Sequence, residues 1–312
     1  MYKNIGDVWT QIGQNIEGEN IEDFLGWSVS LSSDGSTIAI GVPIFNVNIS
    51  NYVRIYKNIG DVWTQIGSDI EGENVEDFFG RCVSLSSDGS IVAIGAYNAH
   101  SSNGNNTGYV KVYKNINNIW TQIGQNINGE ASFDLFGMSI NLSSDGSVVV
   151  IGAPLNDDNG DASGHVRVYQ NINNVWTQVG VDINGENIAD GSGYSISLSS
   201  DVSILAIGAY YAKNNNGDIT GHVRVYDLST VLSLNSFSLS KFNIYPNPTK
   251  YEFSIQLEEG TQLKKLNIYN QLGQFIYSTN TSLVKTKKLS QGIYFVEIET
   301  NKGISTEKLI IN

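Results

Sequence analysis

The sequence predicts an all-β protein in which a four-repeat β-propeller is followed by a small β-sandwich. Tryptophans recur at positions 9, 63, 120 and 176, so their spacings are 54, 57 and 56 residues, and a fixed period of this size is typical of repeat architectures. The composition is rich in Tyr, Val, Ile, Ser and Gly, which favours strands and tight turns over helices. Each copy also shows four short strand patterns and no helical pattern, as expected for a propeller blade.

The four expected strands of a copy follow a fixed order. The first alternates, as in Val29–Leu31, and the second is almost wholly apolar, as in Ile91–Ile94, which predicts that both of its faces are buried. A Ser-Ser-Asp-Gly turn such as Ser86–Gly89 joins them, with the glycine suited to a positive φ. A longer polar loop leads to an alternating third strand, Val110–Tyr113, and an Asn-rich turn leads to the fourth, Trp120–Gly124.

Residues 1–227 can all be assigned to such copies, but the chain begins inside one. Residues 1–13 match residues 55–67 almost letter for letter, so Val8–Gly13 is a spare fourth strand. The last copy has three strands, ending at Val223–Tyr226. We expect Val8–Gly13 to pair with Val223–Tyr226 and close the ring, because closure removes two unpaired edges. The alternative is a fragment of a larger ring whose start has been misplaced.

Charge divides the chain in two. The net charge is −13, yet residues 241–312 hold nine Lys and six Glu and so carry +3, which leaves −16 on residues 1–240. An acidic main domain argues against nucleic acid and anionic membranes as partners. Cys82 is the single cysteine, so no intramolecular disulfide can form. No apolar stretch is long enough to cross a membrane, and the N-terminus lacks the pattern of a signal peptide.

Two copies carry a recognisable motif. Asp77-Phe78-Phe79-Gly80 is followed by Ile94-Gly95-Ala96, and Leu135-Phe136-Gly137 by Ile151-Gly152-Ala153-Pro154. Residues 1–227 therefore resemble FG-GAP repeats, the blades of integrin-α-type β-propellers. In that family a calcium cage lies between the first two strands. Here a short Ser-Ser-Asp-Gly turn takes its place, too small to supply six or more oxygen ligands, so we expect no such cage and no cofactor.

A linker is expected at residues 228–241, and residues 242–312 show about seven short strands, the pattern of a small Ig-like β-sandwich. This segment resembles the type A C-terminal sorting domain of the type IX (Por) secretion system. The matching residues include Pro246, Asn247, Pro248, Gly273, Gly292, Tyr294 and Lys308. The resemblance implies the type IX machinery as a partner and export across the outer membrane of a Gram-negative bacterium, followed by release or surface attachment.

One rim of the propeller is the candidate ligand face. The loops that connect the fourth strand of one copy to the first strand of the next carry Gly-Glu and then Asp in every copy. The loops between the second and third strands vary most in sequence, and both sets of loops are expected at the same rim. The repeated acids are Glu19, Asp23, Glu73, Asp77, Glu130, Asp134, Glu186 and Asp190. They are either ligand-binding groups or, the interpretation we favour, residues that fix the loops through hydrogen bonds to the backbone.

The remaining candidates are weaker. Asp157, Asn159 and Asp161 alternate as in a calcium loop, but the glycine and glutamate of that motif are absent. His165 and His222 stand where other copies have tyrosine, which favours packing over a ligand role. The four repeat tryptophans are expected to pack between blades. The basic residues at the second position of each third strand are expected on a solvent face: Arg54, Lys111, Arg167 and Arg224.

The function that these patterns favour is a secreted or surface-exposed binding module, such as an adhesin, for an extracellular glycan or protein. No nucleophile–base pair, phosphate-binding loop or zinc spacing is present in the sequence. The alternative is an exported polysaccharide-active enzyme with its site on the variable face, and paired carboxylates at glycosidase spacing would favour it. A structural repeat fragment without a ligand is a third interpretation. The sequence leaves open the ligand, the blade number and the oligomeric state.

Overall fold

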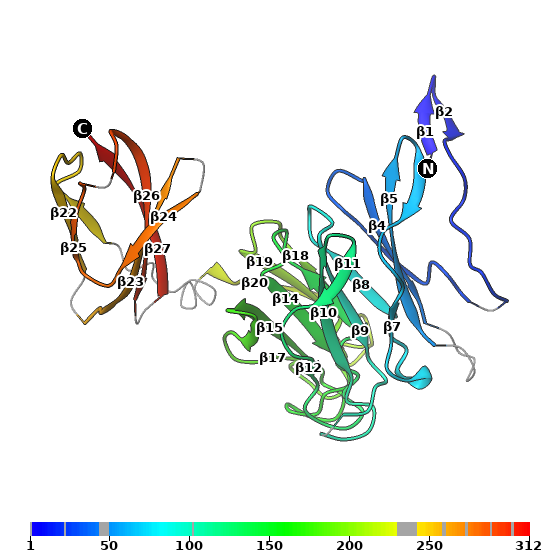
Figure 1. Cartoon of the computed structure of the whole chain (residues 1–312). Helices are drawn as coiled ribbons and strands as arrows, with labels where there is room; N and C mark the ends of the chain where they lie inside the picture. Colours follow the sequence, from blue (N-terminus) through cyan, green and yellow to red (C-terminus); the bar gives the residue numbers. More distant parts are fainter. Residues whose placement is uncertain are drawn as a thin grey trace. The chain divides into compact units, whose positions relative to one another are not determined.

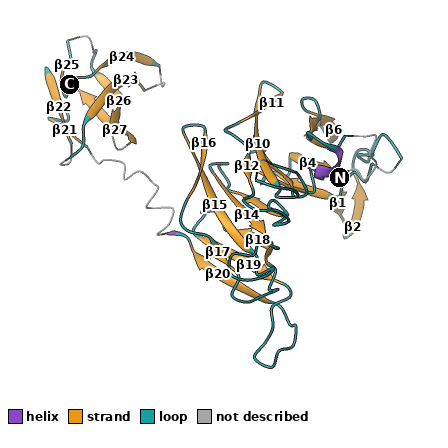
Figure 2. Cartoon of the chain, turned by 90° about the horizontal axis from the view of Figure 1, so that it is seen from below, coloured by secondary structure: helices purple, strands orange, loops and turns teal. Residues whose placement is uncertain are grey.

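The computed structural model describes residues 2–21, 23–43, 50–101, 103–229, 242–257, 260–271, 274–287, 289–300 and 303–312, with backbone alone for 303–306. The chain divides into two compact units, Met1–Ser229 and Thr230–Asn312 (Figure 1). Within the described residues the named elements are antiparallel strands and one 3-10 helix, η1 (Val75–Asp77) (Figure 2). The all-β class is confirmed. Most of the expected linker, residues 230–241, lies outside the described residues.

The first unit contains one sheet for each sequence repeat. The first sheet has β3 (Ser28–Leu31), β4 (Thr37–Val42), β5 (Tyr52–Ile59), β6 (Val62–Gln65) and β7 (Ile70–Glu71). The second has β8 (Cys82–Leu85), β9 (Ile91–Ala96), β10 (Tyr109–Ile116), β11 (Ile119–Gln122) and β12 (Ile127–Asn128). The third has β13 (Ser139–Leu142), β14 (Val148–Ala153), β15 (His165–Ile172), β16 (Val175–Gln178) and β17 (Ile183–Asn184). The fourth has β18 (Ser192–Leu198), β19 (Ile204–Ala209) and β20 (His222–Asp227).

Each complete sheet is organised by its long third strand. In the second sheet, the first half of β10 pairs with the short strand β12, and the second half pairs with β11. The hairpin turn between β10 and β11 is Asn117-Asn118, in which both residues have positive φ, 53° and 66°, as a two-residue type I′ turn requires. All six residues of β9 are buried, which confirms the expectation from their apolar run. The fifth strand was not expected, because two residues are too few for a detectable alternation.

Glycines let neighbouring sheets approach closely. A Cβ added to Gly152 on β14 would lie 2.1 Å from the carbonyl oxygen of Gly193, and a Cβ added to Gly95 on β9 would lie 2.3 Å from that of Gly137. Gly137 is the glycine of the Phe-Gly motif in the following copy. The two halves of the motif therefore meet across the junction between copies, where a side chain would leave no room.

The tryptophans of the fourth strands also join one copy to the next. The indole nitrogen of Trp120 donates to the carbonyl of Ile66 at 2.9 Å, and that of Trp176 donates to the carbonyl of Ile123 at 2.9 Å. This confirms the packing role for these two residues. Trp63 is half-buried, but Trp9 is 70% exposed, so the expected packing between blades is wrong for Trp9. The core of the unit consequently lies between successive sheets.

The structure contradicts closure of the ring by the N-terminal strand. β2 (Val8–Gln11) pairs with β1 (Tyr2–Ile5) in a separate hairpin, whose register Tyr2 to Gln11 repeats that of the hairpin between β5 and β6. Among the described residues β20 pairs with β19 alone. The physical reason is that residues 2–5 repeat the second half of a third strand, so β2 already has its partner two residues away. Val223 and Val225 on β20 stay 68% and 67% exposed.

The second unit consists of two sheets that enclose one core. The smaller sheet has β21 (Asn243–Tyr245), β22 (Glu252–Gln256) and β25 (Leu283–Lys285). The larger has β24 (Phe275–Thr279), β23 (Leu263–Asn270), β26 (Gly292–Thr300) and β27 (Gly303–Ile311), in that order. Fully buried side chains from both sheets, such as Phe253 and Leu266, fill the space between them. Seven strands and a sandwich arrangement are what the sequence predicts here.

Candidate functional site

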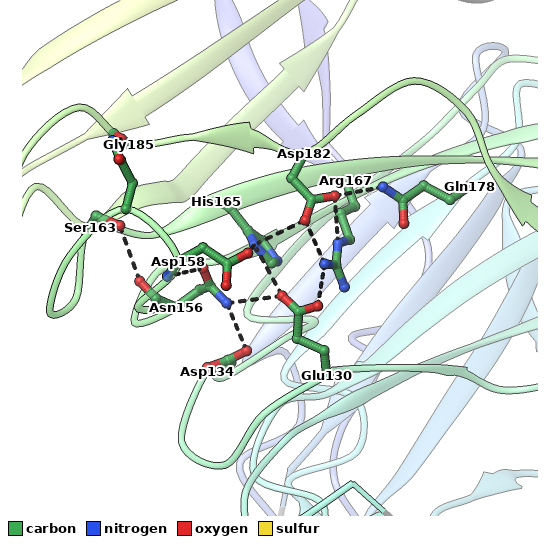
Figure 3. A network of polar contacts seen from close by, with 11 residues as sticks. Glu130, Asp134, Asn156, Asp158, Ser163, His165, Arg167, Gln178, Asp182 and Gly185 are labelled. Carbon is green, nitrogen blue, oxygen red and sulfur yellow. Dashed lines mark hydrogen bonds and ion pairs between the residues drawn. The ribbon is translucent and has the colours of Figure 1, made fainter.

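A network of charged and amide side chains gathers at one end of the third sheet (Figure 3). Glu130 comes from the loop before β13, Asp158 from the loop between β14 and β15, and Asp182 from the segment between β16 and β17. His165 and Arg167 stand on β15 itself, two residues apart. Residues two apart on a strand point to the same face, so β15 presents both side chains to the acidic loops.

The basic residue of each third strand is paired with the glutamate of the loop that precedes the same sheet. The four ion pairs are Glu19–Arg54 (2.9 Å), Glu73–Lys111 (2.6 Å), Glu130–Arg167 and Glu186–Arg224. Arg54, Lys111 and Arg167 are only 6%, 6% and 9% exposed. The expectation that these residues lie on a solvent face is therefore wrong. The loop before the first strand folds over this face, and that long-range contact is invisible in the strand alternation.

The aspartate of each loop is also buried and holds the loop in place. Asp23, Asp77, Asp134 and Asp190 are 2%, 1%, 3% and 1% exposed. Burial acts to raise the pKa of Asp23, but hydrogen bonds from Asn20 and from the Glu19 amide outweigh it and lower that pKa. Burial raises the pKa of Asp77 and of Asp134. The repeated acids thus contact loop and strand, whereas ligand binding by them stays a prediction.

In the first two copies a tyrosine completes this arrangement. The hydroxyl of Tyr52 donates to Asp23 at 3.2 Å, and that of Tyr109 donates to Asp77 at 3.3 Å. In the third copy His165 replaces the tyrosine, and Asn156 donates to the loop aspartate, Asp134, at 3.0 Å instead. The imidazole is thereby left to face a different group of carboxylates.

His165 lies among three carboxylates. Its Nδ1 atom is 3.7 Å from Glu130 Oε1, 3.9 Å from Asp158 Oδ2 and 4.0 Å from Asp182 Oδ2. One donor atom from each of these four residues lies within 4.8 Å of the others. Burial, with a further contribution from the Arg167 charge, lowers the pKa of His165 to about 4. Burial and the neighbouring Glu130 and Asp182 raise the pKa of Asp158.

The three residues named from the calcium-like pattern each make a hydrogen bond within or beside their loop, and metal binding by them stays a prediction. Asp157 accepts from the Ala162 amide at 2.8 Å, and Asn159 donates to the Gly185 carbonyl at 2.7 Å. Asp161 accepts at its backbone carbonyl, from the Ala189 amide at 2.8 Å. These contacts shape the loop. The sequence analysis did not identify Asp158 and Asp182 as candidate site residues. The histidine at position 165, where the first two copies have tyrosine, is the sequence feature that could have indicated a site there.

The Ser-Ser-Asp-Gly turns use their aspartates internally. Asp88 Oδ1 accepts from the Ser86 hydroxyl at 2.7 Å and from the Ser90 amide at 2.9 Å. Although burial opposes ionisation, these hydrogen bonds lower the pKa of Asp88. The turns of successive copies are linked as well, because the Ser87 amide donates to the Ser144 carbonyl at 2.8 Å.

The sorting-motif residues meet at the last strand of the second unit. The side-chain amide of Asn247 donates to the Lys308 carbonyl at 2.6 Å and accepts from the Ile310 amide at 2.9 Å. Pro246 and Pro248 flank Asn247, and Gly292 opens β26 opposite Ile311. The hydroxyl of Tyr294 donates to the Ser290 carbonyl at 3.0 Å. Gly273 lies outside the described residues.

Taken together, these features define a repeat protein of antiparallel sheets joined to a small two-sheet domain. Residues 243–312 match the secretion system C-terminal sorting domain, and residues 128–169 match the FG-GAP repeat. The chain thus contains an FG-GAP repeat and a sorting domain of the Por family, and the sorting domain indicates export by the type IX system. Among the described residues, no helix has the length and apolarity needed to span a membrane.

Comparison with individual proteins gives one curated protein with a short stretch of similar sequence and solved structures of low similarity. An ulvan lyase of Nonlabens ulvanivorans, NLR42, is 29% identical in an alignment of 118 positions that covers 34% of this chain and 22% of the lyase. A periplasmic gluconolactonase of Pseudomonas aeruginosa matches with 12% identity and a TM-score of 0.40, over 91% of this chain and 85% of the other. A hydrazine synthase of Kuenenia stuttgartiensis matches with 11% identity and a TM-score of 0.42, over 96% and 70% of the two chains.

Proposed function

We propose that this protein is an exported glycan-binding module, in which the repeats are blades of a β-propeller and the rim of variable loops holds the ligand. The observation that carries the proposal is a groove of about 670 Å³ on this rim. It lies where the third and fourth copies meet, between the loop before β18 and the loops that follow β14 and β19.

The lining of the groove suits a carbohydrate. Four side-chain amides contribute to it, together with Lys213 and the exposed Ile188: Asn159, Asn187, Asn214 and Asn215. Amides supply both donors and acceptors, which matches the hydroxyls of a sugar. The groove also includes Glu186, a repeated acid that is paired with Arg224. Asn159 and Asn214 already hydrogen-bond within the loops, so their remaining donors and acceptors, together with Asn215 and Lys213, are the polar groups that we assign to recognition.

Aromatic side chains extend the same rim. Tyr210 and Tyr211 begin the loop that carries Asn214, and their ring centroids are 4.3 Å apart. Tyr194 packs on Tyr210 at 4.2 Å. All three tyrosines are 42–48% exposed. Exposed aromatic faces beside a polar groove are typical of ligand sites that combine apolar contact with a few oriented polar groups.

Binding can be tested with the full chain on a glycan array, followed by calorimetric titration of the best ligand. Substitution of Asn214 and Asn215 together by Ala, or Tyr211→Ala, is expected to weaken binding at least about tenfold, or roughly 1.4 kcal/mol. Lys114→Ala is the matched control, since Lys114 lies near the opposite end of its sheet. A wild-type chain that binds no glycan, or variants that bind as tightly as wild type, would refute the proposal.

Export can be tested separately in the producing bacterium. We infer a Gram-negative host and release or display at its outer surface, because the sorting domain directs proteins through the outer membrane. Deletion of residues 242–312 is expected to retain the repeats inside the cell. Normal release of the truncated protein would refute the assignment.

The distant ulvan lyase relative favours a second candidate, a polysaccharide-cleaving enzyme. A lyase leaves an unsaturated sugar at the new chain end, which absorbs in the ultraviolet. Incubation of the full chain with ulvan is expected to give no increase in this absorbance if the protein only binds. A steady increase that is lost when the groove residues are replaced would establish the enzyme instead.

A further inference from the structure

His165 is a buried imidazole without a hydrogen-bond partner. Its side chain is 1% exposed, and neither ring nitrogen makes a hydrogen bond within the described part of the chain. Nδ1 points at oxygens of Glu130, Asp158 and Asp182 from 3.7 to 4.0 Å (Figure 3), distances too long for hydrogen bonds. Buried polar atoms nearly always have partners, so this arrangement points to a missing one.

We propose that Glu130, Asp158, His165 and Asp182 bind a divalent transition-metal ion, for which Zn²⁺ is the best fit. Calcium and magnesium prefer oxygen ligands throughout, whereas zinc accepts imidazole nitrogen and carboxylate oxygen together, most often four of them. Zinc lies about 2.0–2.2 Å from such atoms, so tetrahedral donors are roughly 3.4 Å apart. The three Nδ1 distances exceed this by about 0.3–0.6 Å. All four donor atoms lie within 4.8 Å of one another, so side-chain rotation would have to bring the widest pair closer by up to about 1.4 Å.

Charge favours the same conclusion. Three carboxylates face the site, and one guanidinium, that of Arg167, offsets one of them, so two negative charges remain beside a neutral imidazole. A divalent ion would balance them. Arg167 binds Glu130 through Oε2 and both carboxylate oxygens of Asp182. Glu130 Oε1 accepts from the Asn156 side-chain amide at 3.1 Å and faces His165 Nδ1 at 3.7 Å. Arg167 therefore acts as a positioning residue for both carboxylates, and Asp182 Oδ2 would be shared between its guanidinium and the ion.

The site belongs to the third copy. Tyr52 and Tyr109 occupy the position of His165 in the first two copies and donate to loop aspartates there. The fourth copy has His222, but among the described residues no comparable group of carboxylates surrounds it. The proposal is independent of glycan binding, because its residues are not those that we assign to the groove.

The test is calorimetric titration of the metal-free full chain with Zn²⁺, Mn²⁺ and Ca²⁺, together with the visible absorption of a Co²⁺ complex. One Zn²⁺ per chain and the strong absorption of four-coordinate Co²⁺ are expected. His165→Tyr is expected to weaken zinc binding at least 100-fold and to abolish the absorption, while the fold survives because tyrosine serves at this position in two copies. His222→Tyr is the matched control and is expected to leave both unchanged.

Thermal unfolding provides a second readout, because a ligand of the folded state raises the melting temperature. Zinc is expected to raise it for wild type and for His222→Tyr but not for His165→Tyr. If His165→Tyr does not fold, Asp158→Asn replaces it, with the same expected loss of zinc. Equal zinc binding by the wild type and the folded variant would overturn the proposal, as would binding of calcium alone.

Discussion

The contact between Gly152 and the following copy predicts a large effect from one added methyl group. In Gly152→Ala the new Cβ would lie 2.1 Å from the Gly193 carbonyl oxygen and 2.4 Å from the Ser139 hydroxyl. Gly208 holds the same place in the fourth copy, where a new Cβ would meet the Ser195 hydroxyl at 2.4 Å. A serine hydroxyl therefore lies close at both sites. The two sites differ in that the new Cβ at Gly152 would also meet a backbone carbonyl oxygen of the next copy, whereas the new Cβ at Gly208 would not.

The magnitude follows from this difference. A serine hydroxyl can rotate away, whereas the carbonyl can move only if two sheets separate. Overpacking of this kind typically costs about 1–3 kcal/mol, and we expect Gly152→Ala to fall at the upper end and Gly208→Ala below about 1 kcal/mol. In a unit of this size each 1 kcal/mol lowers the melting temperature by about 2–4 °C.

Tryptophan fluorescence during urea unfolding is a suitable assay, because all five tryptophans lie before residue 230 and report on the first unit alone. The midpoint of Gly152→Ala should shift well below that of Gly208→Ala, with similar slopes. Equal shifts for the two variants would refute the argument that the carbonyl contact sets the requirement for glycine.

Two further predictions concern the ion pairs and the sorting domain. Glu73→Gln should destabilise the first unit more than Glu19→Gln, by about 1–2 kcal/mol. The reason is that Lys111 loses its one carboxylate partner in the described structure, whereas Arg54 loses Glu19 but keeps Asp69 at 2.8 Å. The midpoints of urea unfolding measure this difference, and equal midpoints for the two variants would contradict the prediction. Asn247→Ala should remove both hydrogen bonds to the last strand and lower the free energy of unfolding of the second unit by about 1–3 kcal/mol. Hydrogen exchange of the backbone amides of that strand measures the loss. Unchanged protection would show that the Asn247 side chain is dispensable.

Local patterns were sufficient to predict much of the fold. The apolar run Ile91–Ile94 and the alternation of Val110–Tyr113 depend on neighbours within one sheet, and both fall on strands of the structure. The same reasoning failed for Lys111, because its solvent-side position in the strand pattern is covered by Glu73 from a distant loop. Alternation records which face a residue occupies but not what later folds over that face.

The candidate metal site could not be predicted from local sequence patterns either, because it too depends on contacts between segments that are far apart in the sequence. Its four donors come from three loops and one strand, spread over more than fifty residues, and no spacing rule joins them. The loop pattern directed attention to Asp157 and Asp161, whereas the backbone turns Asp158 toward His165. Only the departure from tyrosine at this repeat position, which the third copy shares with the fourth, hinted that it differs from the first two copies.

The repeated junction between sheets has a consequence for how such a chain changes over evolutionary time. Gly95 with Gly137 and Gly152 with Gly193 are versions of one contact, so a whole copy inserted between two others would form the same contact on both of its sides. Nearly identical stretches such as residues 1–13 and 55–67 offer places where the coding DNA can recombine. We expect homologous proteins to differ in length by whole repeats, while the residues at each junction are retained.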